Sequence, residues 1–164
     1  MAENIFFTTD IEHRAERFQE FWPQFVALIS GEKDEIATFA NAAAAIMEAF
    51  QFHWVGFYFV KDNELVLGPF QGTIACTRIK KGKGVCGTAW AQQKAILVPD
   101  VDAFPGHIAC SSLSKSELVL PLFDAQNEVY AVLDIDSDQL NDFSESDITQ
   151  FSQLVAYISS HLQL

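Results

Sequence analysis

Basic residues are scarce in this chain of 164 residues. Ten Lys and Arg stand against 22 Asp and Glu, which gives a formal net charge of −12. Nucleic acids and anionic membrane surfaces attract clustered Lys and Arg, so neither is expected as a partner. No apolar run reaches the length of a transmembrane helix, which gives a second reason to expect no membrane association.

Cysteine is also rare, with only Cys76, Cys86 and Cys110. Three thiols cannot all pair within one chain, so a structural disulfide framework is not expected. The start of the chain, residues 1–4, lacks the basic and apolar regions of a secretory signal. We therefore expect a cytoplasmic protein, in which cysteines serve as nucleophiles, redox pairs or metal ligands.

Apolar residues, in contrast, are abundant. The composition is 49% hydrophobic and includes 15 Phe. This content excludes a disordered chain and is enough to bury a sizeable core. We expect one domain over residues 1–164, with a helical extension at about 1–31.

Hydrophobic periodicity predicts the order of helices and strands. Apolar residues at intervals of three and four predict helices over 10–29 and 36–50, and a third helix begins near Val85. Ser144 and Asp147 fit a capping box that opens a closing helix. Strands are predicted at 53–60, 64–67, 73–77, 95–98, 117–122 and 129–136. Hairpin connections dominate, so we expect an α+β fold with helices packed on a central antiparallel sheet.

Two of these strands carry unusual faces. Period two places Trp54 and Tyr58 together on the first strand, where they either line a pocket or belong to the core. Asp134 and Asp136 share a face of the last strand. Two neighbouring carboxylates repel one another and need a cationic partner or a shared proton. The pair therefore indicates a functional site, with an exposed strand end as the alternative.

The cysteines lie in two kinds of setting. Cys110 follows His107 in a long irregular segment, 99–116, where it is either an exposed nucleophile or a small buried residue. Cys86 falls in the first turn of a predicted helix, which favours a thiolate. Three cysteines and a histidine are a possible zinc ligand set, but the cysteines lack the close spacing of structural zinc sites. We expect no metal.

Thiol redox chemistry would use both the cysteines and the acidic residues of these strands. A thiolate attacks an electrophilic atom, an acid protonates the leaving oxygen, and a second thiol resolves the oxidised sulfur. A Cys–His hydrolase with His107 as base is an alternative, although clustered acids would serve acyl transfer poorly.

Five motifs resemble those of the free methionine-R-sulfoxide reductases, which have a GAF-domain fold. The motifs are Gly68–Gly72 with Ile74–Cys76, Gly84–Ala89, Gly106–Cys110, Ser116–Pro121 and Leu133–Ser137. The resemblance extends from the second helix to the closing one. One departure is Ser111, at a position where the family often has Asp directly after the cysteine.

The resemblance implies a role for each cysteine. Cys110 would attack the sulfur of free methionine-R-sulfoxide, release methionine and become a sulfenic acid. Cys76 or Cys86 would then form a disulfide with it, which thioredoxin or another dithiol reduces without any bound cofactor. Spacing cannot choose between the two, and we expect Cys76, on its predicted strand, to react first.

The resemblance also implies the substrate contacts. Glu117, Asp134 and Asp136 would hold the ammonium group and the polarised oxygen, with Glu117 and Asp136 taking part in catalysis. Trp54 and Tyr58 would form an aromatic wall. A non-catalytic GAF module that senses redox state or a small ligand is the alternative, and the sequence leaves a possible homodimer open.

Overall fold

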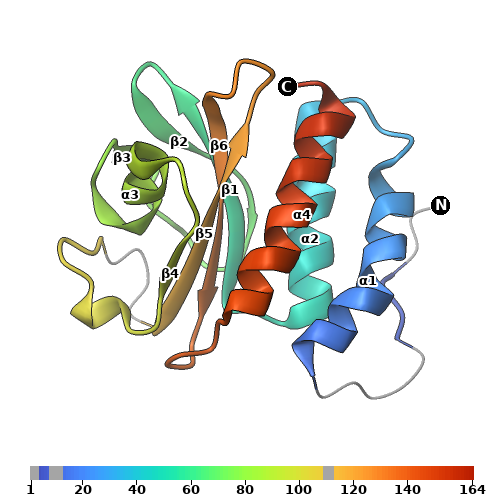
Figure 1. Cartoon of the computed structure of the whole chain (residues 1–164), viewed down its shortest axis with the longest axis horizontal. Coiled ribbons are helices and arrows are strands. Elements are labelled where there is room, and N and C mark those ends of the chain that lie inside the picture. Colours follow the sequence, from blue (N-terminus) through green and yellow to red (C-terminus); the bar gives the residue numbers. More distant parts are fainter. Residues whose placement is uncertain (1–3, 8–12, 109–112) are drawn as a thin grey trace.

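The computed structural model describes residues 4–7, 13–108 and 113–164 of the chain. Its centre is a six-stranded sheet of order β3-β2-β1-β6-β5-β4, in which all neighbouring strands are antiparallel (Figure 1). The strands are β1 Trp54–Lys61, β2 Glu64–Gln71, β3 Arg78–Lys80, β4 Ile96–Val98, β5 Ser116–Phe123 and β6 Val129–Ser137. The predicted α+β class is confirmed.

Three helices lie on one side of this sheet (Figure 1). They are α1 Arg14–Ile29, α2 Glu35–Phe50 and α4 Glu145–Leu162, with α2 and α4 against the strands and α1 packed on the outer side of these two helices. Between them and the sheet lies an apolar core, to which α1 contributes Phe18, Phe21 and Phe25. Inward side chains of β6, such as Leu133, point into the same core, as the alternation predicted. The predicted capping box of α4 is also present.

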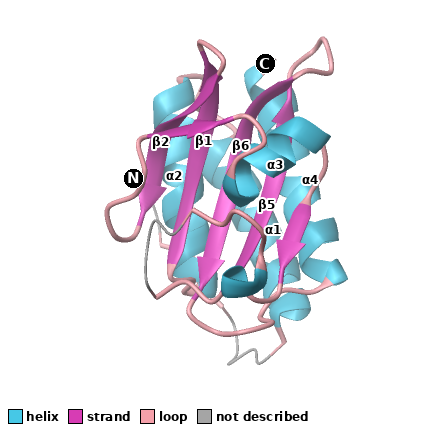
Figure 2. Ribbon diagram, turned by 90° about the vertical axis from the view of Figure 1, so that its left-hand side faces the viewer, coloured by secondary structure: helices cyan, strands magenta, loops and turns pink. Residues whose placement is uncertain are grey.

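A short helix covers the opposite face. Helix α3, Gly84–Gln92, lies over β5 and β6, and Figure 2 shows it in front of the sheet. Its buried residues join a second, smaller apolar cluster that includes Trp54 and Tyr58. The sheet is therefore covered by helical structure on both sides, and its central strands are removed from water.

One arginine ties α1 to the turn that precedes α4. Arg14 Nη2 lies 2.6 Å from Asp142 Oδ1, and Nη1 lies 3.3 Å from Asp147 Oδ2. The guanidinium carbon also lies 5.0 Å from the centre of the Phe52 ring. The first helix is thus fixed to the body of the protein by charge as well as by apolar packing.

Two predicted elements differ from the structure. Strand β2 continues through Gln71, whereas its prediction ended at residue 67. Residues 73–77 were predicted as a strand but form a loop, and the third strand is Arg78–Lys80. An edge strand of three residues has too few side chains for a pattern of period two, so its position depends on pairing with β2. The 99–116 segment also contains one short 3₁₀ helix, Val101–Ala103.

None of the described helices has the length and apolar character needed to cross a bilayer.

Gly87→Ala should destabilise the protein because α3 packs on the β3 turn by backbone contact. A Cβ atom at Gly87 would lie 2.4 Å from the carbonyl oxygen of Lys80, and neither backbone can yield without moving the helix. We expect a loss of about 1–3 kcal/mol in the free energy of unfolding, measured by urea denaturation. Gly31→Ala is the control, since its added Cβ would meet nothing within 4 Å. Equal stability of the two variants would contradict this account of the packing.

Candidate active site

Three carboxyl groups meet on the α3 side of the sheet because of strand register. Asp136 of β6 is paired with Glu117 of β5 on one side and with Trp54 of β1 on the other. Asp134 is two residues earlier on β6 and therefore points to the same face. Its partners are Gly56 and Val119. The expected proximity of Asp134 and Asp136 is confirmed, and Glu117 joins them from the next strand.

Aromatic rings close one side of this acidic group. A Cβ atom at Gly56 would lie 2.3 Å from the Trp54 ring, so the indole lies directly over the glycine. The ring stacks on Tyr58 with centroids 6.0 Å apart and on Phe70 at 5.3 Å. Its Nε1 donates a hydrogen bond of 2.9 Å to the carbonyl oxygen of Thr73. Trp54 and Tyr58 line a pocket and also belong to the second apolar cluster, so both alternatives from the sequence hold.

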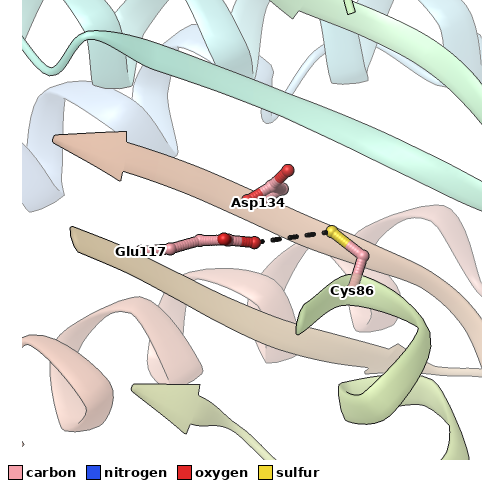
Figure 3. A group of neighbouring side chains, drawn as sticks. All are labelled: Cys86, Glu117 and Asp134. Atoms are coloured by element: carbon pink, nitrogen blue, oxygen red, sulfur yellow. Dashed lines mark hydrogen bonds between the residues drawn. The ribbon is translucent and has the colours of Figure 1, made fainter. Parts of the chain in front are cut away.

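Helix α3 brings a thiol to the other side. Cys86 is only 3% exposed, and its Sγ is 4.0 Å from Glu117 Oε1, a long hydrogen bond from the thiol (Figure 3). The ligand atoms of Cys86, Glu117 and Asp134 all lie within 4.8 Å of one another. The three side chains come from α3, β5 and β6, so the tertiary fold assembles them.

Two hollows open beside these groups and share Asp134 and Asp136. One, of about 30 Å³, is lined also by Cys86 and Glu117. The other lies against Trp54 and Tyr58. His107 lines the first hollow, with Nε2 at 3.8 Å from Glu117 Oε2.

Burial makes the acids unusually weak. Asp134 is 7% exposed, and burial raises its pKa to about 6, although hydrogen bonds with Cys86 and Glu117 offset part of the rise. Burial, together with the charges of Asp134 and Asp136, raises the pKa of Glu117 well above its usual value. The pKa of Asp136 is raised by burial and by Asp134, and a hydrogen bond from Ser114 compensates only in part.

Apart from His107 beside Glu117, the acids have no basic side chain paired with them in the described part of the chain. Among the described residues, no Lys or Arg forms an ion pair with Glu117, Asp134 or Asp136. Asp134 Oδ1 is buried and has no hydrogen-bond partner within the described part of the chain. A site of this kind favours a small ligand that carries a positive charge, and its protonated acids can donate a proton to an oxygen of that ligand.

Comparison with known protein families shows that residues 32–163 match the GAF domain. The chain belongs to the GAF-domain family. A GAF domain-containing protein A from Dictyostelium discoideum is 55% identical over 148 residues, which cover 90% of this chain and 93% of that protein.

Several relatives of this GAF domain are free methionine-R-sulfoxide reductases. A free methionine-R-sulfoxide reductase from Escherichia coli is 44% identical over 151 residues, which cover 92% of this chain and 91% of the enzyme. The X-ray structure of a free methionine-R-sulfoxide reductase from Neisseria meningitidis in complex with its substrate superposes with a TM-score of 0.93. It is 45% identical, and the match covers 99% of this chain and 96% of that one.

The cysteines of the GAF domain differ partly from their predicted settings. Cys110 lies outside the described residues, so its predicted role is not tested. Cys76 is half-buried in the 73–77 loop, which corrects the expectation that a strand holds it. Cys86 does lie in the first turn of α3, but its pKa is raised well above the usual value, by burial and then by Asp134 and Glu117. The expectation of a favoured thiolate was therefore wrong, because burial beside carboxyl groups outweighs the helix terminus.

Ser114 is a residue of the site that sequence reasoning did not select. It lines the larger hollow and donates a hydrogen bond to Asp136. A serine in a loop gives no distinguishing pattern in a single sequence. The only available signal was its position two residues before the strand that carries Glu117.

Asp134→Asn should stabilise the empty protein at alkaline pH. The native pKa of about 6 exceeds the ordinary value of 3.8, so the folded chain binds this proton more tightly than the unfolded chain. Stability is then lost as pH rises from about 4 to above 6, and an uncharged amide avoids that loss. We expect a gain of up to about 3 kcal/mol in the free energy of unfolding at pH 8, falling below about 1 kcal/mol at pH 4.

Urea denaturation at the two pH values measures this difference. Asp138→Asn provides a matched control, since it removes the same charge from an exposed position near the end of β6. The control should change stability by less than about 0.5 kcal/mol. An Asp134→Asn protein that is less stable than wild type at pH 8 would show that the carboxylate is not destabilising.

Proposed function

We propose that this GAF domain is an oxidoreductase that reduces free L-methionine-(R)-S-oxide to L-methionine. The observation that carries the proposal is the group of three desolvated acids beside the Trp54–Tyr58 wall. Relatives named free methionine-R-sulfoxide reductases, at 44 and 45% identity over nearly the whole chain, support it.

The acidic group accounts for recognition of a free amino acid. Burial raises the pKa of Asp134 only to about 6, so this acid is largely ionised at neutral pH. A substrate ammonium would supply the positive charge that no Lys or Arg among the described residues provides. Methionine within a peptide lacks this charge and would leave the carboxylate buried and unpaired, which is costly. The aromatic wall of Trp54 and Tyr58 suits the apolar part of the side chain.

The weak acids also account for oxygen activation. A sulfoxide oxygen becomes a good leaving group only as it gains a proton. Burial beside Asp134 and Asp136 raises the pKa of Glu117 well above its usual value, which favours the protonated form that can donate that proton. Burial and Asp134 likewise raise the pKa of Asp136, which lies opposite Glu117 in the sheet. Acids that are buried together therefore serve both charge recognition and proton transfer.

The thiol steps conserve atoms and electrons. The Cys110 thiolate bonds to the sulfoxide sulfur while an acid of the site protonates the oxygen. The protonated oxygen then moves to the cysteine sulfur as the new S–S bond breaks, so methionine leaves with that electron pair and Cys110 becomes a sulfenic acid. Attack by a second thiol on the resulting sulfenic acid releases water and forms a disulfide. Thioredoxin, or another dithiol, supplies two electrons to restore the thiols in the reducing cytoplasm.

We assign the second thiol to Cys76. The Cys76 loop contributes Thr73 and Ala75 to the hollow beside Trp54, and Cys76 itself is half-buried. The Cys86 thiol is buried and its pKa is raised, which disfavours the reactive thiolate. Cys86 is thus suited to later exchange rather than to the first disulfide.

Reductase activity is tested with racemic free methionine sulfoxide and a chemical dithiol, followed by chiral separation. We expect loss of the R epimer, survival of the S epimer, and no turnover of N-acetylated methionine sulfoxide, whose ammonium charge is absent. Cys110→Ser should reduce turnover to a few per cent or less of wild type, because it removes the attacking sulfur. Comparable turnover of the acetylated compound would refute recognition of the ammonium by the acids. A protein that binds the sulfoxide without turnover would instead be a sensing module.

The order of disulfide formation is a separate prediction. One equivalent of substrate should convert the reduced protein to a Cys76–Cys110 disulfide and leave Cys86 as a thiol. Blocking free thiols and mapping cross-linked peptides by mass spectrometry identifies the pair. A trapped Cys86–Cys110 bond with freely alkylated Cys76 would reverse the order, while the reductase proposal would stand.

A further inference from the structure

The thiol of Cys86 has no use in recognition of an ammonium group, although it lies among the acids that would provide it. An ammonium is held well by carboxylates alone. Sulfur adds little to that contact, but a thiolate is a strong ligand for zinc and similar metals. The combination of one sulfur with two carboxylates therefore suggests a second kind of cation.

The geometry of the three donors is close to that of a metal site. Their ligand atoms lie within 4.8 Å of one another, and Figure 3 shows the Cys86 sulfur directed toward Glu117 beside Asp134. Ligand atoms around a tetrahedral zinc ion lie roughly 3.5 Å apart, so side-chain movements of about 1 Å would close the site. The hollow of about 30 Å³ beside these residues has room for an ion.

A separate observation points to a missing ligand. Asp134 is only 7% exposed, and its Oδ1 has no hydrogen-bond partner within the described residues. A buried acceptor without a partner costs about 1–3 kcal/mol. Asp134 lines both hollows, and a cation bound there could satisfy this oxygen.

We propose that Cys86, Glu117 and Asp134 form an inhibitory Zn²⁺ site in the active-site pocket. Zinc would displace the thiol proton and any carboxyl protons to solvent, and would compete with the ammonium group of the substrate for the same carboxylates. The thiolate selects zinc over Mg²⁺ and Ca²⁺, which prefer oxygen ligands. Water or the imidazole of His107, 3.8 Å from Glu117, completes a four-ligand shell. The spacing of cysteines along the chain gave no sign of this site, because two of its ligands are carboxylates from neighbouring strands.

Metal binding is tested on the full chain, stripped with a chelator and kept reduced with a phosphine, since dithiols bind zinc themselves. Titration with Co²⁺ should produce a thiolate-to-cobalt charge-transfer band in the near ultraviolet, and Zn²⁺ should remove it. Cys86→Ser should abolish the band and weaken zinc binding by more than about 100-fold, because it removes a direct ligand. Cys76→Ser and Cys110→Ser are matched controls and should retain both. A band that survives Cys86→Ser, or that either control removes, would overturn the site.

If Cys86→Ser folds poorly, Asp134→Asn provides a second test, because it changes another of the three ligands. Circular dichroism first establishes that the variant is folded. Zinc should then raise the unfolding temperature of wild type but not of Asp134→Asn, and an equal rise in both would refute the assignment. These readouts require no reductase activity, so they stand apart from the proposed function.

The inhibitory part of the proposal does rest on the proposed function. Free methionine-R-sulfoxide should weaken apparent zinc affinity in proportion to its concentration, as expected for two ligands of one site. Zinc that binds through Cys86 but is not displaced would refute competition. Absence of turnover, with Cys86-dependent zinc binding intact, would refute the reductase and leave the metal site in place.

Discussion

Burial of three carboxyl groups with no Lys or Arg partner among the described residues is the constraint on which this structure depends. Such a group is unfavourable by itself, as the raised pKa values of Glu117, Asp134 and Asp136 indicate. It persists because the acids belong to strands whose register is fixed elsewhere. A shift of one residue in β6 would turn Asp134 toward the helices and Leu133 toward the pocket. The apolar core on the other face of the sheet therefore holds the acids in place.

One face of the sheet stabilises the fold, and the other face carries the candidate active site. On the side of α1, α2 and α4, aromatic and aliphatic side chains pack with few polar atoms. On the side of α3, the apolar cluster is smaller and surrounds the acids and the Cys86 thiol. Desolvation on this second face weakens the acids as anions but strengthens every contact that they make with a cation. A site that is costly when empty is in this way prepared for a charged ligand.

The sequence predicted those features that have a local cause. Alternation along 129–136 was enough to assign Asp134 and Asp136 to one face, and the capping box marked the start of α4. Features with a tertiary cause were missed. The pKa of Cys86 depends on carboxyl groups from two distant strands, whereas sequence reasoning considered only its own helix. The loop at 73–77 likewise resembles a strand by composition, and only pairing with β2 decides that the strand begins at Arg78.

The contribution of α1 bears on where this domain begins. The family match covers residues 32–163, yet Phe18, Phe21 and Phe25 lie in the same core as α2 and α4, and Arg14 is paired with Asp142 and Asp147. The segment matched by the family model is therefore smaller than the packed unit, whereas the relatives align over 90% or more of the chain. A boundary drawn at residue 31 would cut through the hydrophobic interior and leave an aromatic surface open to aggregation. For this GAF domain, the boundary has to be defined by packing rather than by the extent of the family model.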